Sequence, residues 1–201
     1  MDWSIFHAVN EFAGDERWLA HAVYAFERFG VVLYVLAVAL LWLASRPGTD
    51  RRWKLAALAG TASAGLALLI NQAIGKVVWH RPRPYDSHAG VYHLSNSHDA
   101  SFPSDHASAA FAIALGIYLV DRRVGRLFVA VAAAIAAGRV LIGAHYPGDV
   151  LAGLGVGLAA ALIVVRLGGP LLVRAVRVLE RISDPVVAPL HERLGRSSAA
   201  G

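Results

Sequence analysis

The stretch from residue 101 to residue 120, SFPSDHASAAFAIALGIYLV, places three polar side chains directly before a long apolar run. The apolar run is a candidate helix, and Ser104 and Asp105 suit its N-cap and first turn, where an acceptor and a negative charge are stabilising. His106 has no part in such a cap. Because polar groups at or in a membrane cost free energy, this cluster indicates a functional role.

The composition of the whole chain indicates a membrane protein. Of its 201 residues, 57% are hydrophobic and only 16% are charged, whereas soluble domains are about 25% charged. The length suits one domain of several helices. The chain contains no cysteine, which excludes a disulfide framework and a thiolate metal site.

Five segments are apolar enough to cross a membrane, and we expect each of them to be a helix. They lie at about residues 30–45, 55–79, 104–120, 127–144 and 149–165. Small residues crowd three of them, as in GTASAG, AAAIAAG and AGLGVGLAAA, and such residues allow helices to pack closely in lipid. The sequence therefore predicts an all-α integral membrane bundle of about five transmembrane helices, with amphipathic terminal segments, as one domain over residues 1–201.

The two ends of the chain are expected to lie at the membrane surface. Residues 1–28 form the predicted N-terminal surface segment, an amphipathic helix or a solvated cap, although a further span within residues 5–28 stays open. Residues 30–165 form the predicted transmembrane core, with residues 80–103 as an outer loop. Residues 166–201 form a predicted cytoplasmic amphipathic tail that two prolines, Pro185 and Pro189, interrupt.

The distribution of basic residues orients the predicted bundle. With five spans, the loops at residues 46–54 and 121–126 and the tail share one side of the membrane. They carry four, three and six basic residues, 13 of the 19 in the chain. The positive-inside rule places this side in the cytoplasm. We therefore expect a multi-pass protein of the cell (inner or plasma) membrane, with the loop at residues 80–103 facing outside.

Polar residues from segments far apart in the sequence reach this outer face. They are Lys76, Arg83, Ser104, His106, Arg139, His145 and Asp149. Three cations beside a helix N-terminus form an anion site, and the planar arginine side chain suits phosphate oxygens. Two histidines beside such a site fit phosphoryl transfer, one as the nucleophile and one as the acid that protonates the leaving oxygen.

Asp149 follows His145 by four residues and falls in the first turn of the next predicted helix, because Pro147 suits the first helical position. From there the carboxylate can reach back to one imidazole nitrogen and determine which nitrogen carries the proton. The other nitrogen would then be free to attack phosphorus.

These residues also have interpretations without catalysis. Lys76 and Arg83 can extend their charges to the membrane surface, and His145 with Asp149 can cap a helix. Arg139 is harder to explain in this way, since a charge in an apolar helix costs about 2.5–3.5 kcal/mol. The loop histidines match no compact metal motif, so we expect a solvated loop and no metal. They are His80, His88, His93 and His98.

Three sequence blocks resemble the signature of the type-2 phosphatidic acid phosphatase superfamily. The blocks are Lys76 to Arg83-Pro84, Pro103-Ser104-Asp105-His106, and Gly138-Arg139 to His145 and Asp149. All spacings agree within about residues 55–165. Asp105 replaces a glycine of the signature. The stretch SFPSDHA, which contains this aspartate, resembles the bacitracin-resistance type of undecaprenyl-pyrophosphate phosphatase. Gly138 replaces a serine, which removes one phosphate hydrogen bond.

The resemblance implies a role for each site residue. His145 is the expected nucleophile, Asp149 its partner and His106 the general acid. The expected phosphate-binding residues are Lys76, Arg83, Ser104 and Arg139, and Asp105 is a further candidate. The resemblance implies no metal and no cofactor. The expected reaction hydrolyses undecaprenyl (polyprenyl) pyrophosphate to the monophosphate through a phosphohistidine and so recycles the lipid carrier of cell-wall synthesis.

Two alternatives stay open on the sequence. A phosphatidylglycerophosphate or phosphatidic acid phosphatase fits the same residues, and only SFPSDHA favours the lipid pyrophosphate. A membrane transporter would place charges near the middle of the bilayer and could contain an internal repeat, whereas this chain gathers its charges at one interface. We expect the lipid pyrophosphate and the membrane as partners and no nucleic acid.

Overall fold

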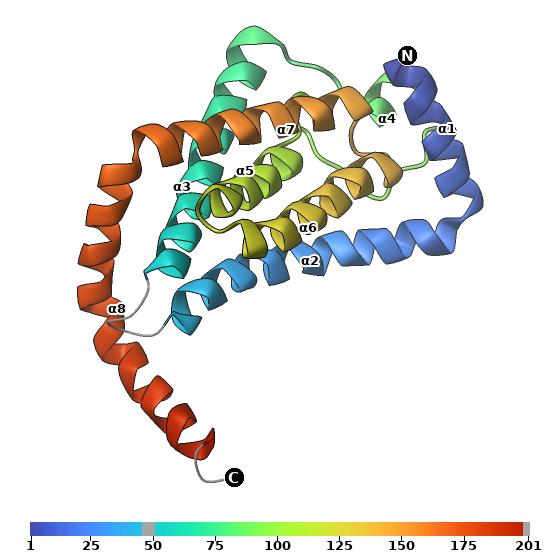
Figure 1. The fold of residues 1–201 in the computed structure, drawn as a ribbon. Helices are drawn as coiled ribbons and strands as arrows, with labels where there is room; N and C mark the ends of the chain where they lie inside the picture. The colour runs from blue at the N-terminus through green and yellow to red at the C-terminus, as the bar shows by residue number, and fades with distance from the viewer. Residues whose placement is uncertain (46–50, 199–201) are drawn as a thin grey trace.

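The apolar run after Ser104 forms helix α5 (Asp105–Val120), the central element of a helical bundle (Figure 1). Its N-cap is Ser104, whose hydroxyl accepts a hydrogen bond from the Ala107 backbone N–H at 3.5 Å. Helices α3 (Arg52–Ala73), α6 (Arg122–Leu141) and α7 (Pro147–Leu162) pack around α5. Most of α5 is therefore buried.

The remaining elements surround this core in the computed structural model, which describes residues 1–45 and 51–198. Helices α1 (Asp2–Asp15) and α2 (Arg17–Ala44) precede it, the short α4 (Pro84–Ser87) lies in the loop, and α8 (Gly169–Ser198) follows it. Two π-helical turns, η1 (Ile74–Val78) and η2 (Ile163–Leu167), extend α3 and α7. All secondary structure of the described residues is helical, which confirms the predicted fold class.

Within the described ranges, four helices are long and apolar enough to cross a membrane, namely Arg17–Ala44, Arg52–Val78, Arg122–Leu141 and Pro147–Leu167. The third predicted span, at residues 104–120, forms α5, an apolar helix of only 16 residues. A helix of that length extends about 24 Å, less than the roughly 30 Å hydrocarbon core. It ends early because Asp121 caps the next helix, accepting hydrogen bonds from the backbone N–H groups of Arg123 and Val124.

The structure divides the predicted N-terminal surface segment. Helix α1 ends at Asp15, whereas residues 17–28 form the first part of α2 and continue into the apolar segment. The boundary predicted at residues 28–30 therefore falls inside α2. The physical reason is that Glu27 is only 4% exposed and pairs with the buried Arg139 instead of facing water.

Helix α8 runs across the ends of α7, α3 and α2, at the end of the bundle away from the N-terminus (Figure 1). Buried Lys54 of α3 donates hydrogen bonds to Glu180 and Asp184 of α8. The prediction that prolines interrupt the tail is wrong, because α8 continues through Pro185 and Pro189. Each proline removes only one main-chain hydrogen bond.

Glycines of α7 allow its close contact with α5. A Cβ atom on Gly157 would lie 2.8 Å from the Ala112 backbone nitrogen, whereas one on Gly155 would meet nothing within 4 Å. The small residues at this contact therefore serve packing within the chain.

We expect Gly157→Ala to lower the free energy of unfolding by about 1–3 kcal/mol, because the added methyl group pushes α7 away from the backbone of α5. Gly155→Ala is the matched control and should be neutral or slightly stabilising, since alanine favours helix. Thermal unfolding in detergent measures both effects. Equal stability of the two variants would contradict the close contact between the helices.

Candidate active site

Two helix N-termini meet beside the loop at residues 80–104. We call this end of the bundle the loop side. The backbone N–H of Ser104, at the start of α5, donates to the Asp149 carbonyl oxygen in the first turn of α7 at 3.1 Å. Between α6 and α7 the chain turns at Gly143, whose φ of 76° suits glycine. This turn places His145 directly before α7.

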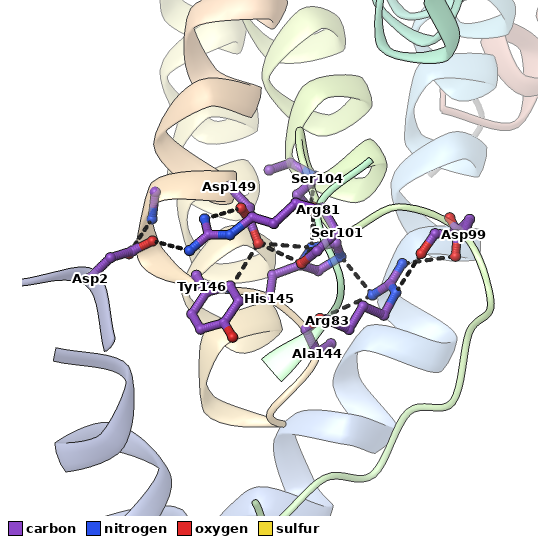
Figure 2. Close-up of polar contacts among 12 residues, drawn as sticks. Asp2, Arg81, Arg83, Asp99, Ser101, Ser104, Ala144, His145, Tyr146 and Asp149 are labelled. Atoms are coloured by element: carbon purple, nitrogen blue, oxygen red, sulfur yellow. Dashed lines mark hydrogen bonds and ion pairs between the residues drawn. The ribbon is translucent and has the colours of Figure 1, made fainter. Parts of the chain in front are cut away.

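His145 is buried, and both of its ring nitrogens have a hydrogen-bond partner. Its Nδ1 donates a hydrogen bond to the Ser101 carbonyl oxygen at 2.9 Å (Figure 2). Because a carbonyl oxygen only accepts, Nδ1 carries the proton and Nε2 holds the lone pair. Nε2 lies 3.2 Å from Nη1 of Arg83.

Burial lowers the pKa of His145, and the charges of Arg139 and Arg83 act in the same direction, while Asp149 opposes them. The lowered pKa keeps the imidazole neutral at neutral pH. A neutral ring whose unprotonated Nε2 points at an arginine side chain is an arrangement suited to a histidine nucleophile.

Asp149 is fully buried and is held by neighbours other than the imidazole. Its carboxylate accepts hydrogen bonds from the Ser101 hydroxyl at 2.6 Å, the Tyr146 backbone N–H at 2.9 Å and the Arg81 guanidinium at 2.6 Å. Its Oδ2 lies 3.8 Å from Nδ1 of His145, outside hydrogen-bond range. The hydrogen bond expected between Asp149 and Nδ1 of His145 is therefore not formed, because the Asp149 carboxylate caps its own helix. The Ser101 carbonyl oxygen accepts from Nδ1 instead. Asp149 influences His145 through its charge.

Arg83 is anchored on two sides. Its Nη1 donates to the Ala144 carbonyl oxygen at 3.0 Å, and its Nη2 donates to the Asp99 carboxylate at 2.9 Å (Figure 2). These contacts hold the guanidinium beside Nε2 of His145. A phosphoryl group that reaches Nε2 would therefore meet a fixed positive charge.

Arg139 lies in the last turn of α6 and is 6% exposed. Its Nη1 donates to Glu27 of α2 at 2.9 Å, while its Nε has no partner among the described residues. It lies within electrostatic range of both His106 and His145. The structure thus places Arg139, a predicted phosphate-binding residue, near both histidines. It also pairs Arg139 with Glu27, an acidic partner that the sequence did not predict.

The other predicted site residues border two cavities at the first turn of α5, next to the buried cap Ser104. His106 is exposed and, with Asp105, lines an apolar cavity of about 230 Å³. Lys76 and Asp105 line a second, more polar cavity of about 160 Å³. Asp105 itself accepts a hydrogen bond from Asn71 at 2.7 Å. Lys76 therefore lines a different cavity from His106.

Several residues that complete the site were missed by the sequence analysis. Arg81 bridges Asp149 and Asp2, at 2.6 and 2.7 Å, and its Cζ lies 3.9 Å from the centroid of the Tyr146 ring (Figure 2). Asp2 also accepts a hydrogen bond from the Gly148 backbone N–H at 2.8 Å, which ties α1 to the start of α7. The first Arg-Pro pair of RPRP, Arg81-Pro82, is the only sequence signal for Arg81.

We expect Arg81→Gln to move the acidic limb of the pH profile of kcat/KM to higher pH. Loss of the cation leaves the charge of Asp149 less compensated, which stabilises the imidazolium and raises the pKa of His145. With neutral His145 as the expected nucleophile, activity should then be lost earlier as the pH falls. Arg81→Lys keeps the charge and should leave the limb near its original position. An unmoved limb in Arg81→Gln would contradict this coupling.

Comparison with known proteins gives consistent relationships. Residues 53–171 match the family model of the PAP2 superfamily. The chain is 28% identical over 193 residues to undecaprenyl-diphosphatase BcrC of Bacillus subtilis, covering 96% of this chain and 97% of that protein. It is 33% identical over 135 residues to a decaprenylphosphoryl-5-phosphoribose phosphatase of Mycobacterium tuberculosis, covering 67% and 71%. A solved PAP2-type phosphatidylglycerolphosphate phosphatase of Bacillus subtilis shares the fold, with a TM-score of 0.59 at 22% identity, covering 84% of this chain and 86% of that one.

Proposed function

The chain belongs to the PAP2 superfamily, and from this premise we propose that it hydrolyses undecaprenyl diphosphate, or a similar polyprenyl diphosphate, to the monophosphate. The observation that carries the proposal is the neutral His145, whose unprotonated Nε2 accepts a hydrogen bond from Arg83 at 3.2 Å. The choice of a diphosphate is supported by the likeness to an undecaprenyl-diphosphatase over nearly the whole chain. Hydrolysis would return the lipid carrier of cell-wall synthesis to use.

In the proposed reaction, Nε2 of His145 attacks the terminal phosphorus. The N–P bond forms while the bond from phosphorus to the bridging oxygen breaks, and His106 gives its proton to the departing lipid monophosphate. The phosphorylated ring is cationic, and the Ser101 carbonyl oxygen and the Asp149 charge stabilise it. Water then attacks phosphorus and loses a proton to His106, while the N–P bond breaks and its electron pair returns to Nε2, which releases inorganic phosphate.

The apolar cavity beside His106 supports a substrate with a long hydrocarbon tail. Its other lining residues include Val31, Tyr34, Leu68, Ala109 and Ile135. A larger cavity of about 510 Å³ between α2, α3 and α8 shares Val35 and Ile113 with it. A polyprenyl tail in the first cavity could therefore continue along α2, while the diphosphate stays at the histidines.

We expect Ala109→Phe to raise KM for a long polyprenyl diphosphate at least about tenfold, which corresponds to about 1.4 kcal/mol of lost binding. The phenyl ring would fill the cavity that receives the first part of the tail. A short, water-soluble diphosphate should be hydrolysed almost as before. Ala133→Phe, exposed on α6 and outside both cavities, is the matched control. Equal losses on both substrates would exclude this path for the tail.

Phosphate release by the purified protein tests the proposed reaction. With undecaprenyl diphosphate and a metal chelator, we expect one inorganic phosphate and one lipid monophosphate per substrate. A radiolabelled terminal phosphate should give a phosphoprotein that is labile to acid and stable to base, as a phosphohistidine is. Faster turnover of phosphatidylglycerophosphate or phosphatidic acid would contradict the diphosphate and favour those lipids.

We also propose that the loop side faces the outside of the cell membrane, on the charge distribution described above. The chain has no cysteine, so Asn96→Cys on the loop side and Arg122→Cys at the other end, both exposed positions, each introduce a unique thiol. An impermeant reagent applied to intact cells should label Asn96→Cys alone. Labelling of Arg122→Cys alone would place the site in the cytoplasm.

A further inference from the structure

Gly138 and Glu27 meet where α6 packs against α2. Gly138 precedes Arg139 and stands where the family signature has serine. A Cβ atom on Gly138 would lie only 2.5 Å from Oε1 of Glu27 and 3.1 Å from a methyl carbon of Val23. A side chain at position 138 would therefore require the Glu27 carboxylate to move. The carboxylate of Glu27 therefore occupies the place of the missing serine side chain.

Glu27 needs a partner at this position. It is 4% exposed on a helix that is apolar enough to cross a membrane, and an unpaired carboxylate there would be costly. Its Oε2 accepts a hydrogen bond from Nη1 of Arg139 at 2.9 Å. Oε1 of Glu27 and Nε of Arg139 have no hydrogen-bond partner within the described part of the chain. The carboxylate thus engages one corner of the guanidinium and leaves the buried Nε donor available to an anion.

We propose that Glu27 is a positioning residue that holds Arg139 for the phosphate of the substrate, and that the glycine at position 138 provides the space for it. This inference rests on the proposed function and on the phosphate-binding role that the family resemblance implies for Arg139. The carboxylate fixes the guanidinium from the α2 side, while the Nε donor takes a phosphate oxygen. In this chain the Glu27 carboxylate thereby takes the place of the serine hydroxyl of the signature and orients Arg139.

The proposal requires positions 27 and 138 to be energetically coupled. Gly138→Ser alone should displace the Glu27 carboxylate from Arg139 and lower kcat/KM at least about tenfold. Glu27→Ala alone should leave Arg139 without its countercharge and cause a loss of its own. In the double variant the serine meets no carboxylate, so Gly138→Ser causes no further decrease in kcat/KM. The double variant should therefore be at least about tenfold more active than the product of the two single losses predicts.

The affinity for inorganic phosphate separates a positioning role from a merely structural one. With phosphate as a competitive inhibitor, Glu27→Ala and the equally large Glu27→Gln should raise Ki at least about threefold in correctly folded protein. Glu27→Asp keeps the charge and should recover part of the affinity. Glu11→Ala, which removes an exposed acid of α1, is the control and should leave Ki unchanged.

An activated aryl phosphate serves as the substrate in these assays, so that the outcome does not depend on the proposed lipid. Failure to hydrolyse polyprenyl diphosphate would then refute the proposed substrate while the coupling and the Ki values still test Glu27. Losses that multiply independently in the double variant would overturn the inference. An unchanged Ki in folded Glu27→Gln would do so as well, because Glu27 would then only stabilise the bundle.

Discussion

His145→Ala is expected to abolish the hydrolysis of every substrate, with a loss in kcat of at least about 10⁴-fold, since removal of a covalent nucleophile costs up to about 10⁶-fold. The reason lies in the geometry of one ring. The Ser101 carbonyl holds the proton on Nδ1 at 2.9 Å, and Nε2 therefore presents its lone pair beside Arg83. Without this nitrogen the phosphoryl group has no covalent acceptor, whatever leaving group it carries.

Turnover of an activated aryl phosphate and of a lipid diphosphate by the same preparations measures this effect. His98→Ala is a suitable control, because His98 is an exposed histidine of the loop and lines none of the cavities at the site. The labelled phosphoprotein should disappear in His145→Ala and persist in His98→Ala. Substantial turnover by His145→Ala on either substrate would overturn the covalent mechanism.

His106→Ala is expected to have a large effect that depends on the leaving group. General acid catalysis contributes about 10²–10⁴-fold where the departing oxygen needs a proton. An alkoxide that leaves from an alkyl monophosphate needs it most, whereas a lipid phosphate or an activated phenolate leaves more easily. We therefore expect the full loss on alkyl monophosphates and a smaller loss on aryl phosphates. The exposed position of His106 at the apolar cavity is consistent with a donor near the lipid side of the substrate.

The ratio of kcat/KM for the parent and His106→Ala, measured on both substrate types, decides between two roles. A loss that grows with the pKa of the leaving group supports the general acid. Equal losses across leaving groups would instead identify His106 as a phosphate-binding residue. The Arg83→Lys variant provides a comparison, because it weakens an anion site and should affect all phosphates alike.

Apolar composition and residue spacing were sufficient to predict the helical class and the region of the site. Long apolar segments must be helical in lipid, because each backbone polar group needs a partner within its own segment. The cap at Ser104 and the proline before Asp149 are local signals, and both mark real helix starts. The chain itself therefore indicated the two helix N-termini whose contact brings His106 and His145 to one end of the bundle.

Local patterns were less informative where a distant contact determines the structure. The pattern of residues 1–28 predicts an amphipathic surface helix or a solvated cap. Glu27 is instead buried by a partner 112 residues away in the sequence. The prolines of the tail were read as an interruption, yet α8 continues and is held by the buried Lys54.

By itself the sequence determined the class of the fold, the segments that cross the membrane and the blocks that carry the predicted chemistry, since these depend on hydrophobicity and on spacing within short segments. Only the tertiary structure decided which groups surround His145, the expected nucleophile. The Ser101 carbonyl in place of Asp149 at Nδ1, the Arg81 bridge from Asp149 to Asp2, and the Glu27 carboxylate over Gly138 are all contacts between distant segments. Hydrogen bonds and steric exclusion act over a few ångströms, so such contacts follow from helix packing and leave no periodic signal in the chain.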